Sequence, residues 1–336
     1  MVGTEGVHEE ACLRLRTANR VLLRLARIRV ARWAEADREL ERADLSGVAK
    51  PGEPVWLESS VRLPGAPSTS ALRSWLAKTW QRPVHPAAGE DRASPGTRLV
   101  LRLVEGDGTL SADASGELLF RRGWRQEVGR APMRETLAAG VLALAAWRVG
   151  EPLWDPMCGS GTLVIEAALR ARRIVPGGLR AFAFEGWPGT DAGAWAERRD
   201  RAVREALSVT PAPIHGSDLN AGALGTVRRN ARRAGVVESL LLERADIRTV
   251  APGPVAPGVL VTNLPYGRRA GKRSELEEVF GSVDRALRQR FQGWRAALLT
   301  EDPERLARVF GRKADAVHAL DNGGLHVALC VFPPAL

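Results

Sequence analysis

A glycine-rich turn between a short apolar run and a helical pattern constrains this chain more than any other feature. Residues 152–154 are mostly apolar, residues 155–162 read DPMCGSGT, and residues 163–173 carry the apolar spacing of a helix. Glycine lets the backbone approach a ligand closely, and a helix N-terminus presents unpaired N–H groups. The order strand, turn, helix therefore predicts a site for a nucleotide-type cofactor at the end of a strand.

Downstream of Met133 the apolar pattern alternates between short strands and helices, which is typical of a parallel sheet covered by helices. We expect a Rossmann-like, doubly wound α/β domain over residues 130–336, with seven strands. Residues 321–324 read DNGG, a hairpin signal, so we expect one antiparallel strand, the last one, at the edge of the sheet. The expected strands are 152–154, 213–216, 240–243, 259–261, 294–299, 314–320 and 325–332, and the expected helices are 134–147, 163–173, 192–207, 221–234, 275–291 and 303–310.

Residues 1–122 have a mixed pattern that predicts a smaller α+β region. Alternation over residues 98–104 and 109–114, with Gly106 and Gly108 between them, predicts a hairpin. We also expect helices over 17–26 and 70–80, strands over 27–31, 54–63 and 118–122, a loop over 85–97 and a connector over 123–132.

The composition is that of a globular protein, with 45% hydrophobic and 26% charged residues in a chain of 336. No apolar stretch is long enough to span a bilayer, and the N-terminus lacks the order of a signal peptide, so we expect a cytoplasmic protein and no membrane partner. The three cysteines, Cys12, Cys158 and Cys330, form no C-x-x-C pair, and histidine is sparse. We therefore expect neither a metal site nor a disulfide framework.

The net charge of +10 and the isoelectric point of about 10.7 favour a nucleic acid partner. Lysine occurs only at positions 50, 78, 272 and 313, so nearly all of the positive charge comes from arginine. A GC-rich genome produces the same bias without selection for binding. The charge therefore only supports a nucleic acid partner, and the main argument for that partner comes from the sequence motifs.

The turn opens with an acid, Asp155, and lacks the third glycine of the dinucleotide fingerprint G-x-G-x-x-G. A carboxylate at this position suits the amino group of a methionine-type cofactor, whereas a phosphate-binding turn remains the alternative. Cys158 lies inside the turn. We expect it to be a small residue facing the cofactor, in preference to a nucleophile.

Two further acids follow predicted strands. Asp218 ends the strand over 213–216 and is suited to accept from both hydroxyls of a ribose. Its alternative role is to cap the helix over 221–234, for which Asn220 competes. Asp246 follows the strand over 240–243 and is suited to accept from an adenine amino group. Its alternative is a solvated acid in a turn.

The segment Asn263-Leu264-Pro265-Tyr266 follows another apolar strand. An exocyclic amine on a base is a poor nucleophile, and two acceptors near its hydrogens draw its nitrogen toward tetrahedral geometry. The Asn263 side chain and the Leu264 carbonyl are candidates for these acceptors, because Pro265 biases Leu264 to an extended conformation. Tyr266 is suited to stack on a base taken out of its helix. The pattern predicts methyl transfer to a planar amine, with S-adenosylmethionine as donor; an ordinary turn is the alternative.

Four segments resemble a known family. They are PMRETLAA (132–139), DPMCGSGTLVIEAAL (155–169), GSDLNAGAL (216–224) and NLPYG (263–267). Together they resemble the THUMP-domain RNA guanine-N2 methyltransferases, and most of all the bacterial enzymes that act on large-subunit ribosomal RNA. The resemblance covers about residues 116–336, and the family usually has proline where Leu264 stands.

The resemblance implies an S-adenosylmethionine site and a guanine pocket. Asp155, Gly159 and Gly161 would contact the methionine part and Thr136 the carboxylate end, while Asp218 would hold the ribose and Asp246 the adenine. The complete expected cofactor site is Thr136, Asp155, Pro156, Cys158, Gly159, Gly161, Asp218 and Asp246, and the target guanine would lie against Asn263, Leu264, Pro265 and Tyr266.

The expected function is methylation of guanine N2 in large-subunit (23S) ribosomal RNA. Residues 1–122 would form a THUMP-like, ferredoxin-like RNA-binding region, shortened at its N-terminus relative to the family. Three alternatives stay open: a transfer RNA substrate, methylation of adenine N6 or a glutamine amide, and an RNA-binding assembly factor without turnover. The oligomeric state is not predicted.

Overall fold

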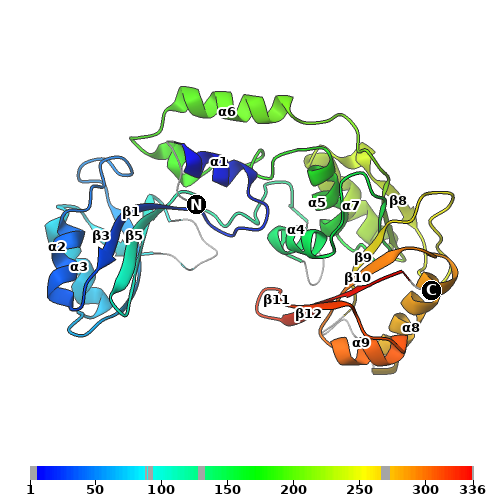
Figure 1. Cartoon of the computed structure of the whole chain (residues 1–336). Coiled ribbons are helices and arrows are strands. Elements are labelled where there is room, and N and C mark those ends of the chain that lie inside the picture. The colour runs from blue at the N-terminus through cyan, green and yellow to red at the C-terminus, as the bar shows by residue number, and fades with distance from the viewer. Residues whose placement is uncertain (1–5, 88, 90–93, 128–132, 266–272, 335–336) are drawn as a thin grey trace. The chain divides into compact units, whose positions relative to one another are not determined.

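The computed structural model describes residues 6–87, 89, 94–127, 133–265 and 273–334 (Figure 1). The chain divides into two compact units. The first comprises Met1–Arg121 and Arg180–Ala202, and the second comprises Arg122–Leu179 and Val203–Leu336. Within the described ranges, no helix is long and apolar enough to cross a membrane.

The second unit is built on a seven-stranded sheet with the order β11-β12-β10-β9-β6-β7-β8. Five strands from β10 to β8 run parallel, with β6 in the middle of the group. This arrangement confirms the predicted Rossmann-like class. The strands are β6 (Leu153–Asp155), β7 (Ile214–Asp218), β8 (Leu241–Arg244), β9 (Val259–Asn263), β10 (Arg295–Thr300), β11 (Ala316–Asp321) and β12 (His326–Phe332).

Helices cover both faces of this sheet because neighbouring strand residues point to opposite sides. Leu153 packs in a core with α4 (Glu135–Leu144), α5 (Thr162–Ala171) and α7 (Ala221–Arg233). The next residue, Trp154, packs in a second core with α8 (Arg273–Gln289) and α9 (Pro303–Phe310). The central strands are therefore buried on both faces, as expected for a parallel sheet covered by helices.

The last strand, β12, is antiparallel as predicted, but it is not at the edge of the sheet. It pairs with β10 on one side and with β11 on the other, so that β11 forms the edge. The burial patterns explain the difference. Most of β12 is buried, whereas half-buried and exposed positions alternate along β11. An interior strand needs apolar residues on both faces.

The first unit contains a five-stranded sheet with the order β1-β5-β4-β2-β3 and the helices α1 (Val7–Arg14), α2 (Trp33–Glu41) and α3 (Thr69–Thr79). The predicted hairpin is present, since β4 and β5 pair antiparallel. The strands are β1 (Leu22–Arg29), β2 (Val55–Arg62), β3 (Val84–Pro86), β4 (Thr97–Val104) and β5 (Asp107–Asp113). That this α+β unit binds RNA stays a prediction.

Several local predictions in this unit were wrong. The stretch predicted as a helix over 17–26 runs into β1, because long-range pairing with β5 overrides the apolar spacing that suggested a helix. The short β3 lies at the start of the predicted loop over 85–97 and pairs with β2. The predicted strand over 118–122 is a turn without sheet pairing.

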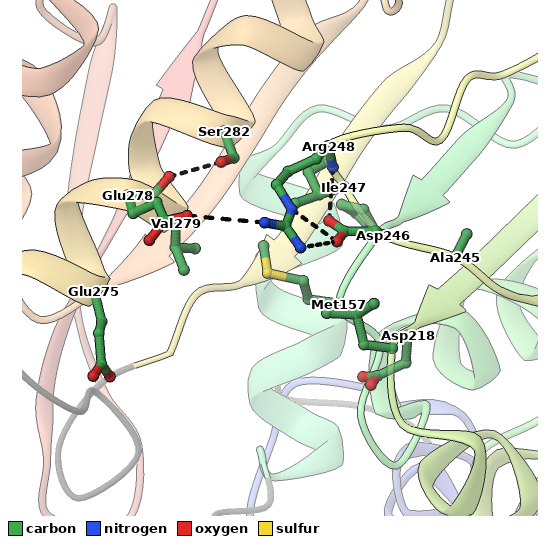
Figure 2. Close-up of a pocket in the computed structure, with 12 residues that line it drawn as sticks. Met157, Asp218, Ala245, Asp246, Ile247, Arg248, Glu275, Glu278, Val279 and Ser282 are labelled. Atoms are coloured by element: carbon green, nitrogen blue, oxygen red, sulfur yellow. Dashed lines mark hydrogen bonds and ion pairs between the residues drawn. The ribbon is translucent and has the colours of Figure 1, made fainter.

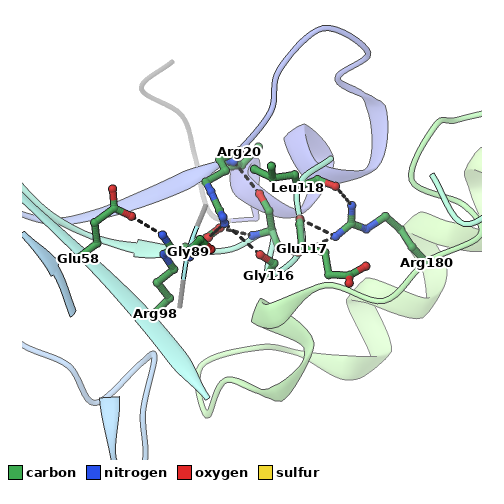
Figure 3. A network of polar contacts seen from close by, with 11 residues as sticks. Arg20, Glu58, Gly89, Arg98, Gly116, Glu117, Leu118 and Arg180 are labelled. Carbon is green, nitrogen blue, oxygen red and sulfur yellow. Dashed lines mark hydrogen bonds and ion pairs between the residues drawn. The ribbon is translucent and has the colours of Figure 1, made fainter. Parts of the chain in front are cut away.

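The backbone of that turn is held by one arginine instead of a neighbouring strand (Figure 3). The Arg180 guanidinium donates to the carbonyls of Leu118 at 2.7 Å, Glu117 at 2.7 Å, Ser115 at 3.0 Å and Arg121 at 3.2 Å. A charged donor that reaches four carbonyls satisfies backbone groups that a strand would otherwise pair. This contact also explains why Arg180 and the residues after it belong to the first unit.

Helix α6 (Ala192–Arg204) was expected to be an outer helix of the second domain, but most of it belongs to the first unit. Its buried Trp195 packs edge-on against Phe184, with ring centroids 4.9 Å apart. Arg198 forms an ion pair with the buried Glu9 at 3.0 Å. A charged helix sequence indicates exposure on one side but does not indicate which partner covers the other side.

Candidate functional site

The glycine-rich turn joins β6 to α5 at the centre of the seven-stranded sheet. Gly159 and Gly161 have φ angles of 54° and 82°, in the left-handed region that favours glycine. A Cβ atom at Gly161 would lie 2.6 Å from a methyl carbon of Val227 on α7, so close packing also demands glycine there. The Gly161 N–H donates to the Cys158 carbonyl at 2.8 Å, which closes the turn.

Asp155 ends β6 and is almost completely buried. Its Oδ1 accepts from the Thr262 hydroxyl at 2.7 Å and from the Met157 backbone N–H at 3.2 Å. Burial raises the pKa of this carboxyl to about 7, against the lowering effect of both hydrogen bonds. Thr262, on the neighbouring strand β9, was not predicted as part of the site. It holds the acid at its place under the turn.

Asp218 ends β7 and holds the turn from the other side. Its Oδ2 accepts from the Gly159 backbone N–H at 2.9 Å, and its Oδ1 accepts from the Asn220 N–H at 2.8 Å. The α7 cap is Asn220, whose Oδ1 accepts from the N–H groups of Gly222 and Ala223. The alternative role of Asp218 as helix cap is therefore wrong, and its carboxylate is available to the site.

A pocket of about 310 Å³ lies at this edge of the sheet (Figure 2). Its lining includes two of the predicted acids, Asp218 and Asp246, together with Pro156 of the turn. Residues that directly follow the predicted acids, Leu219 and Ile247, add apolar walls, and so does Met157. The remaining described lining residues are Ala245, Arg248, Glu275, Glu278, Val279 and Ser282.

Part of this lining was open to prediction and part was not. Leu219 and Ile247 each stand next to an acid at a strand end, so their position follows from the same rule that located the acids. Glu275, Glu278 and Val279 come from α8, which nothing in the local sequence connected with the pocket.

Asp246 is not a solvated turn acid, because its side chain is only 17% exposed and lies under Arg248. The Arg248 guanidinium approaches Asp246 Oδ2 with Nη2 at 2.6 Å and Nε at 2.8 Å. The hydrogen bond from Nε is the main cause of the lowered pKa of the Asp246 carboxyl. The Nη1 atom of Arg248 also lies 3.9 Å from Oε1 of Glu278 on α8.

Asn263 ends β9, the strand next to β6 on the side away from β7. Its side-chain oxygen is buried, and within the described ranges it accepts no hydrogen bond. The Leu264 N–H donates to the Leu299 carbonyl at 3.0 Å, and the Leu264 side chain is buried in the core under α8. Pro265 is half-buried, and Tyr266 lies outside the described residues.

Two other predicted cofactor residues have buried side chains. Thr136 lies in the first turn of α4 beside Glu135, which forms a buried ion pair with Arg125 at 2.9 Å. The Cys158 side chain belongs to the apolar core, and burial raises the pKa of its thiol well above the ordinary value. The expectation that Cys158 faces the cofactor is therefore corrected: its backbone shapes the turn, and its thiol packs against the core.

The predicted acids and Asn263 lie along one edge of the sheet. β9, β6, β7 and β8 are neighbours in this order and run parallel, and each is followed or ended by one of these residues. The strand β12 is inserted antiparallel between β10 and β11, a glycine turn follows the central strand, and an acidic pocket lies beside that turn. These features define the Rossmann-like class of fold, with its candidate ligand site at the carboxyl ends of the parallel strands.

Residues 122–329 match the family described as RMKL-like, methyltransferase domain, and the chain belongs to this family. Its relatives include two proteins named ribosomal RNA large subunit methyltransferase K/L. The one from Allochromatium vinosum is 34% identical over 336 residues, which cover 96% of this chain and 45% of the relative. The one from Syntrophotalea carbinolica is 42% identical over 255 residues, covering 72% of this chain and 35% of the relative. The chain thus spans less than half the length of these relatives.

Two solved structures are similar over nearly the whole chain. A possible methylase from Clostridium difficile 630 has a TM-score of 0.82 and 27% identity, covering 98% of this chain and 87% of that one. The protein SMU.472, crystallised in complex with S-adenosylhomocysteine (SAH), has a TM-score of 0.81 and 28% identity with the same coverage. The similarity extends across both units of the fold.

Proposed function

We propose that this chain is an S-adenosylmethionine-dependent RNA methyltransferase that methylates the exocyclic N2 amine of a guanine in large-subunit ribosomal RNA. One observation carries the proposal. Asn263 ends β9, and its Oδ1 accepts no hydrogen bond from the residues that the structure describes. The glycine turn held by Asp218 follows the neighbouring parallel strand β6 and adjoins a pocket lined by acids.

The pocket suits the proposed cofactor in charge and in shape. Four acids line it, namely Asp218, Asp246, Glu275 and Glu278, against one basic side chain among the described lining residues, so it favours a cationic ligand. Its apolar walls suit the flat face of a purine. When bound, S-adenosylmethionine supplies a methyl group activated by a positively charged sulfur. SMU.472, which shares this fold, was crystallised with the demethylated product SAH.

The residues of this chain divide the work of holding such a cofactor. Asp218, which holds the turn through the Gly159 N–H, would accept from the ribose hydroxyls, and its position at a strand end supports this role. Asp246, which follows the next strand, would accept from the adenine amino group. The buried Asp155 and the first turn of α4, with Thr136, would lie nearest the methionine end.

Asn263 would activate the nucleophile, which is the exocyclic amine of the target base. Its Oδ1 is a buried acceptor, and a buried polar atom without a donor is costly unless a ligand completes it. An amine hydrogen supplies that missing donor. Acceptance of this hydrogen by Asn263, and of the second hydrogen by the Leu264 carbonyl, would draw the nitrogen lone pair out of the ring. Formation of the new nitrogen–carbon bond would break the bond between the methyl carbon and the sulfur of the donor, whose sulfur would keep the electron pair. The amine would then lose one proton to solvent.

The choice of substrate rests on the relatives and on the charge. The relatives are named ribosomal RNA large subunit methyltransferase K/L, and the net charge of +10 suits a nucleic acid. The first unit is the proposed THUMP-like RNA-binding region. Guanine N2 is the target that the resemblance of the Asn263–Tyr266 segment implies.

The test has two stages. Calorimetry should show that the purified chain binds SAH with a stoichiometry of one. Labelled S-adenosylmethionine is then incubated with separate pools of unmodified ribosomal RNA, transfer RNA and DNA, and the product is digested and identified by mass spectrometry. N2-methylguanine in ribosomal RNA is the expected result. If label appeared in transfer RNA alone, transfer RNA would replace ribosomal RNA as the proposed substrate. N6-methyladenine in the product would exclude guanine N2 as the target. Absence of SAH binding would favour an assembly factor without turnover.

A further inference from the structure

Arg248 occupies a special place in the pocket, because it is the one basic side chain among the described residues that line it. Figure 2 shows its guanidinium between Asp246 on one side and Glu278 of α8 on the other. The distances to the nearest oxygens of these acids are 2.6 Å and 3.9 Å. The guanidinium is thus held from two walls of the same pocket.

The two oxygens of Asp246 are used differently. Oδ2 accepts from Arg248 Nε at 2.8 Å and forms an ion-pair contact with Nη2 at 2.6 Å. Oδ1 accepts from the Arg248 backbone N–H at 2.8 Å. A carboxylate oxygen accepts about two hydrogen bonds. Within the described part of the chain, the guanidinium therefore covers Oδ2, and Oδ1 retains the capacity to accept one more.

We propose that Arg248 is a specificity-determining residue for the purine of the cofactor: it holds Asp246 so that one acceptor position stays open, which fits a 6-amino purine and rejects a 6-oxo purine. A 6-amino group donates to the open position of Oδ1. A 6-oxo group presents an oxygen to the same carboxylate, so two acceptors would face each other and neither would be satisfied. The inference rests on the proposed function for the adenosyl ligand and for the assignment of Asp246 to its amino group.

The role of Arg248 is to position Asp246, since its side chain is 59% exposed and the acid beneath it is only 17% exposed. Without the guanidinium, Oδ2 would lose its hydrogen bond and its ion pair, and the carboxylate would be free to turn and to bind water. The pocket would then present a less directed acceptor. Affinity for the 6-amino ligand should fall, while affinity for the 6-oxo ligand, which gained nothing from Asp246, should change little.

The experiment measures binding of SAH and of its 6-oxo analogue S-inosylhomocysteine by calorimetry, without any RNA. The wild-type chain should prefer SAH by about 10- to 100-fold, the range expected for one misplaced hydrogen bond to a charged group. Arg248→Ala should reduce the preference to about threefold through loss of SAH affinity, and Arg248→Lys should restore part of it, because one donor returns. Arg232→Ala, which removes an exposed arginine of α7 outside the pocket, is the control and should leave the preference unchanged.

A second variant tests the same geometry from the acid. Asp246→Asn places an amide beside Arg248, and its N–H₂ group donates to a 6-oxo group, so the preference should shift toward S-inosylhomocysteine. If Arg248→Ala kept the wild-type preference, or if Arg248→Ala bound SAH more tightly than wild type, the role assigned to Arg248 would be overturned and the proposed function would stand. If the wild-type chain bound neither ligand, the proposed function itself would be overturned.

Discussion

The carboxylate of Asp218 accepts a hydrogen bond from the backbone N–H of Gly159 at 2.9 Å, which ties the end of β7 to the turn that follows β6. Asp155 holds the start of the same turn through the N–H of Met157. The turn is therefore kept in shape by acids from two neighbouring strands. Such preorganisation is what a site needs to hold a flexible ligand with little loss of entropy on binding.

Replacement of Asp218 should weaken cofactor binding with little effect on folding. Asp218→Ala removes both the acceptor for Gly159 and the proposed acceptor for the ribose, so the Kd for SAH should rise by about 10- to 100-fold. Calorimetry measures the affinity, and urea denaturation measures the stability. Asn220→Ala is the matched control two residues away: it removes the α7 cap, so it should lower the free energy of unfolding by about 1 kcal/mol and leave the Kd unchanged. The opposite pattern would show that Asp218 is structural.

Asn263→Ala should separate catalysis from cofactor binding. The variant loses the unpaired Oδ1 that is proposed to accept from the target amine. By analogy with the loss of one preorganised polar group at a reacting centre, methyl transfer should fall by about 100-fold or more. The rate is measured with saturating labelled cofactor, and the Kd for SAH, measured alongside, should stay within about twofold of wild type. Equal loss of SAH binding would refute the proposed division between Asn263 and the glycine turn.

The buried carboxyl of Asp155 should make stability depend on pH. Its pKa in the folded state is about 7, raised by burial from an ordinary value of 3.8. Below about pH 4 it is protonated in both the folded and the unfolded chain. Between about pH 4 and 7 only the folded chain keeps the proton, so stability falls as pH rises, by up to about 4 kcal/mol above pH 7.

Asp155→Asn tests this dependence, because an amide oxygen can still accept from Thr262 and Met157. Urea denaturation across pH 4–8 should show the variant gaining stability relative to wild type as pH rises. Glu135, whose pKa is also raised to about 7 by burial, titrates in both proteins and cancels in the comparison. A difference that is constant over this range would rule out a raised pKa at Asp155.

The ion pair between Arg125 and Glu135 should matter for folding. Both side chains are buried, with exposures of 10% and 3%. Arg125 also donates to the Thr162 hydroxyl at 2.6 Å, at the start of α5. Arg125→Ala would leave the carboxylate buried without its cation, so the free energy of unfolding at pH 8 should drop by about 3 kcal/mol. The double variant with Glu135→Gln should recover part of this loss. If the second change adds to the loss instead, the pair is not coupled as the distances indicate.

The sequence by itself determined the fold class and the edge of the sheet where the site lies. Apolar runs that end at Asp155, Asp218 and Asn263 indicated buried parallel strands, and the carboxyl ends of parallel strands meet at one edge. The glycines of the turn were equally predictable, since their left-handed φ angles are a local property. These features depend on residues close together in the chain, where periodicity and turn chemistry decide the outcome.

Only the tertiary structure decided which partner each side chain meets. It placed β12 between β10 and β11, converted part of a predicted helix into β1, turned the Cys158 thiol into the core and laid Arg248 over Asp246. The same local pattern is compatible with several partners. Which of them is chosen depends on the burial and pairing energy of groups far apart in the sequence, and that energy exists only once the sheet has formed.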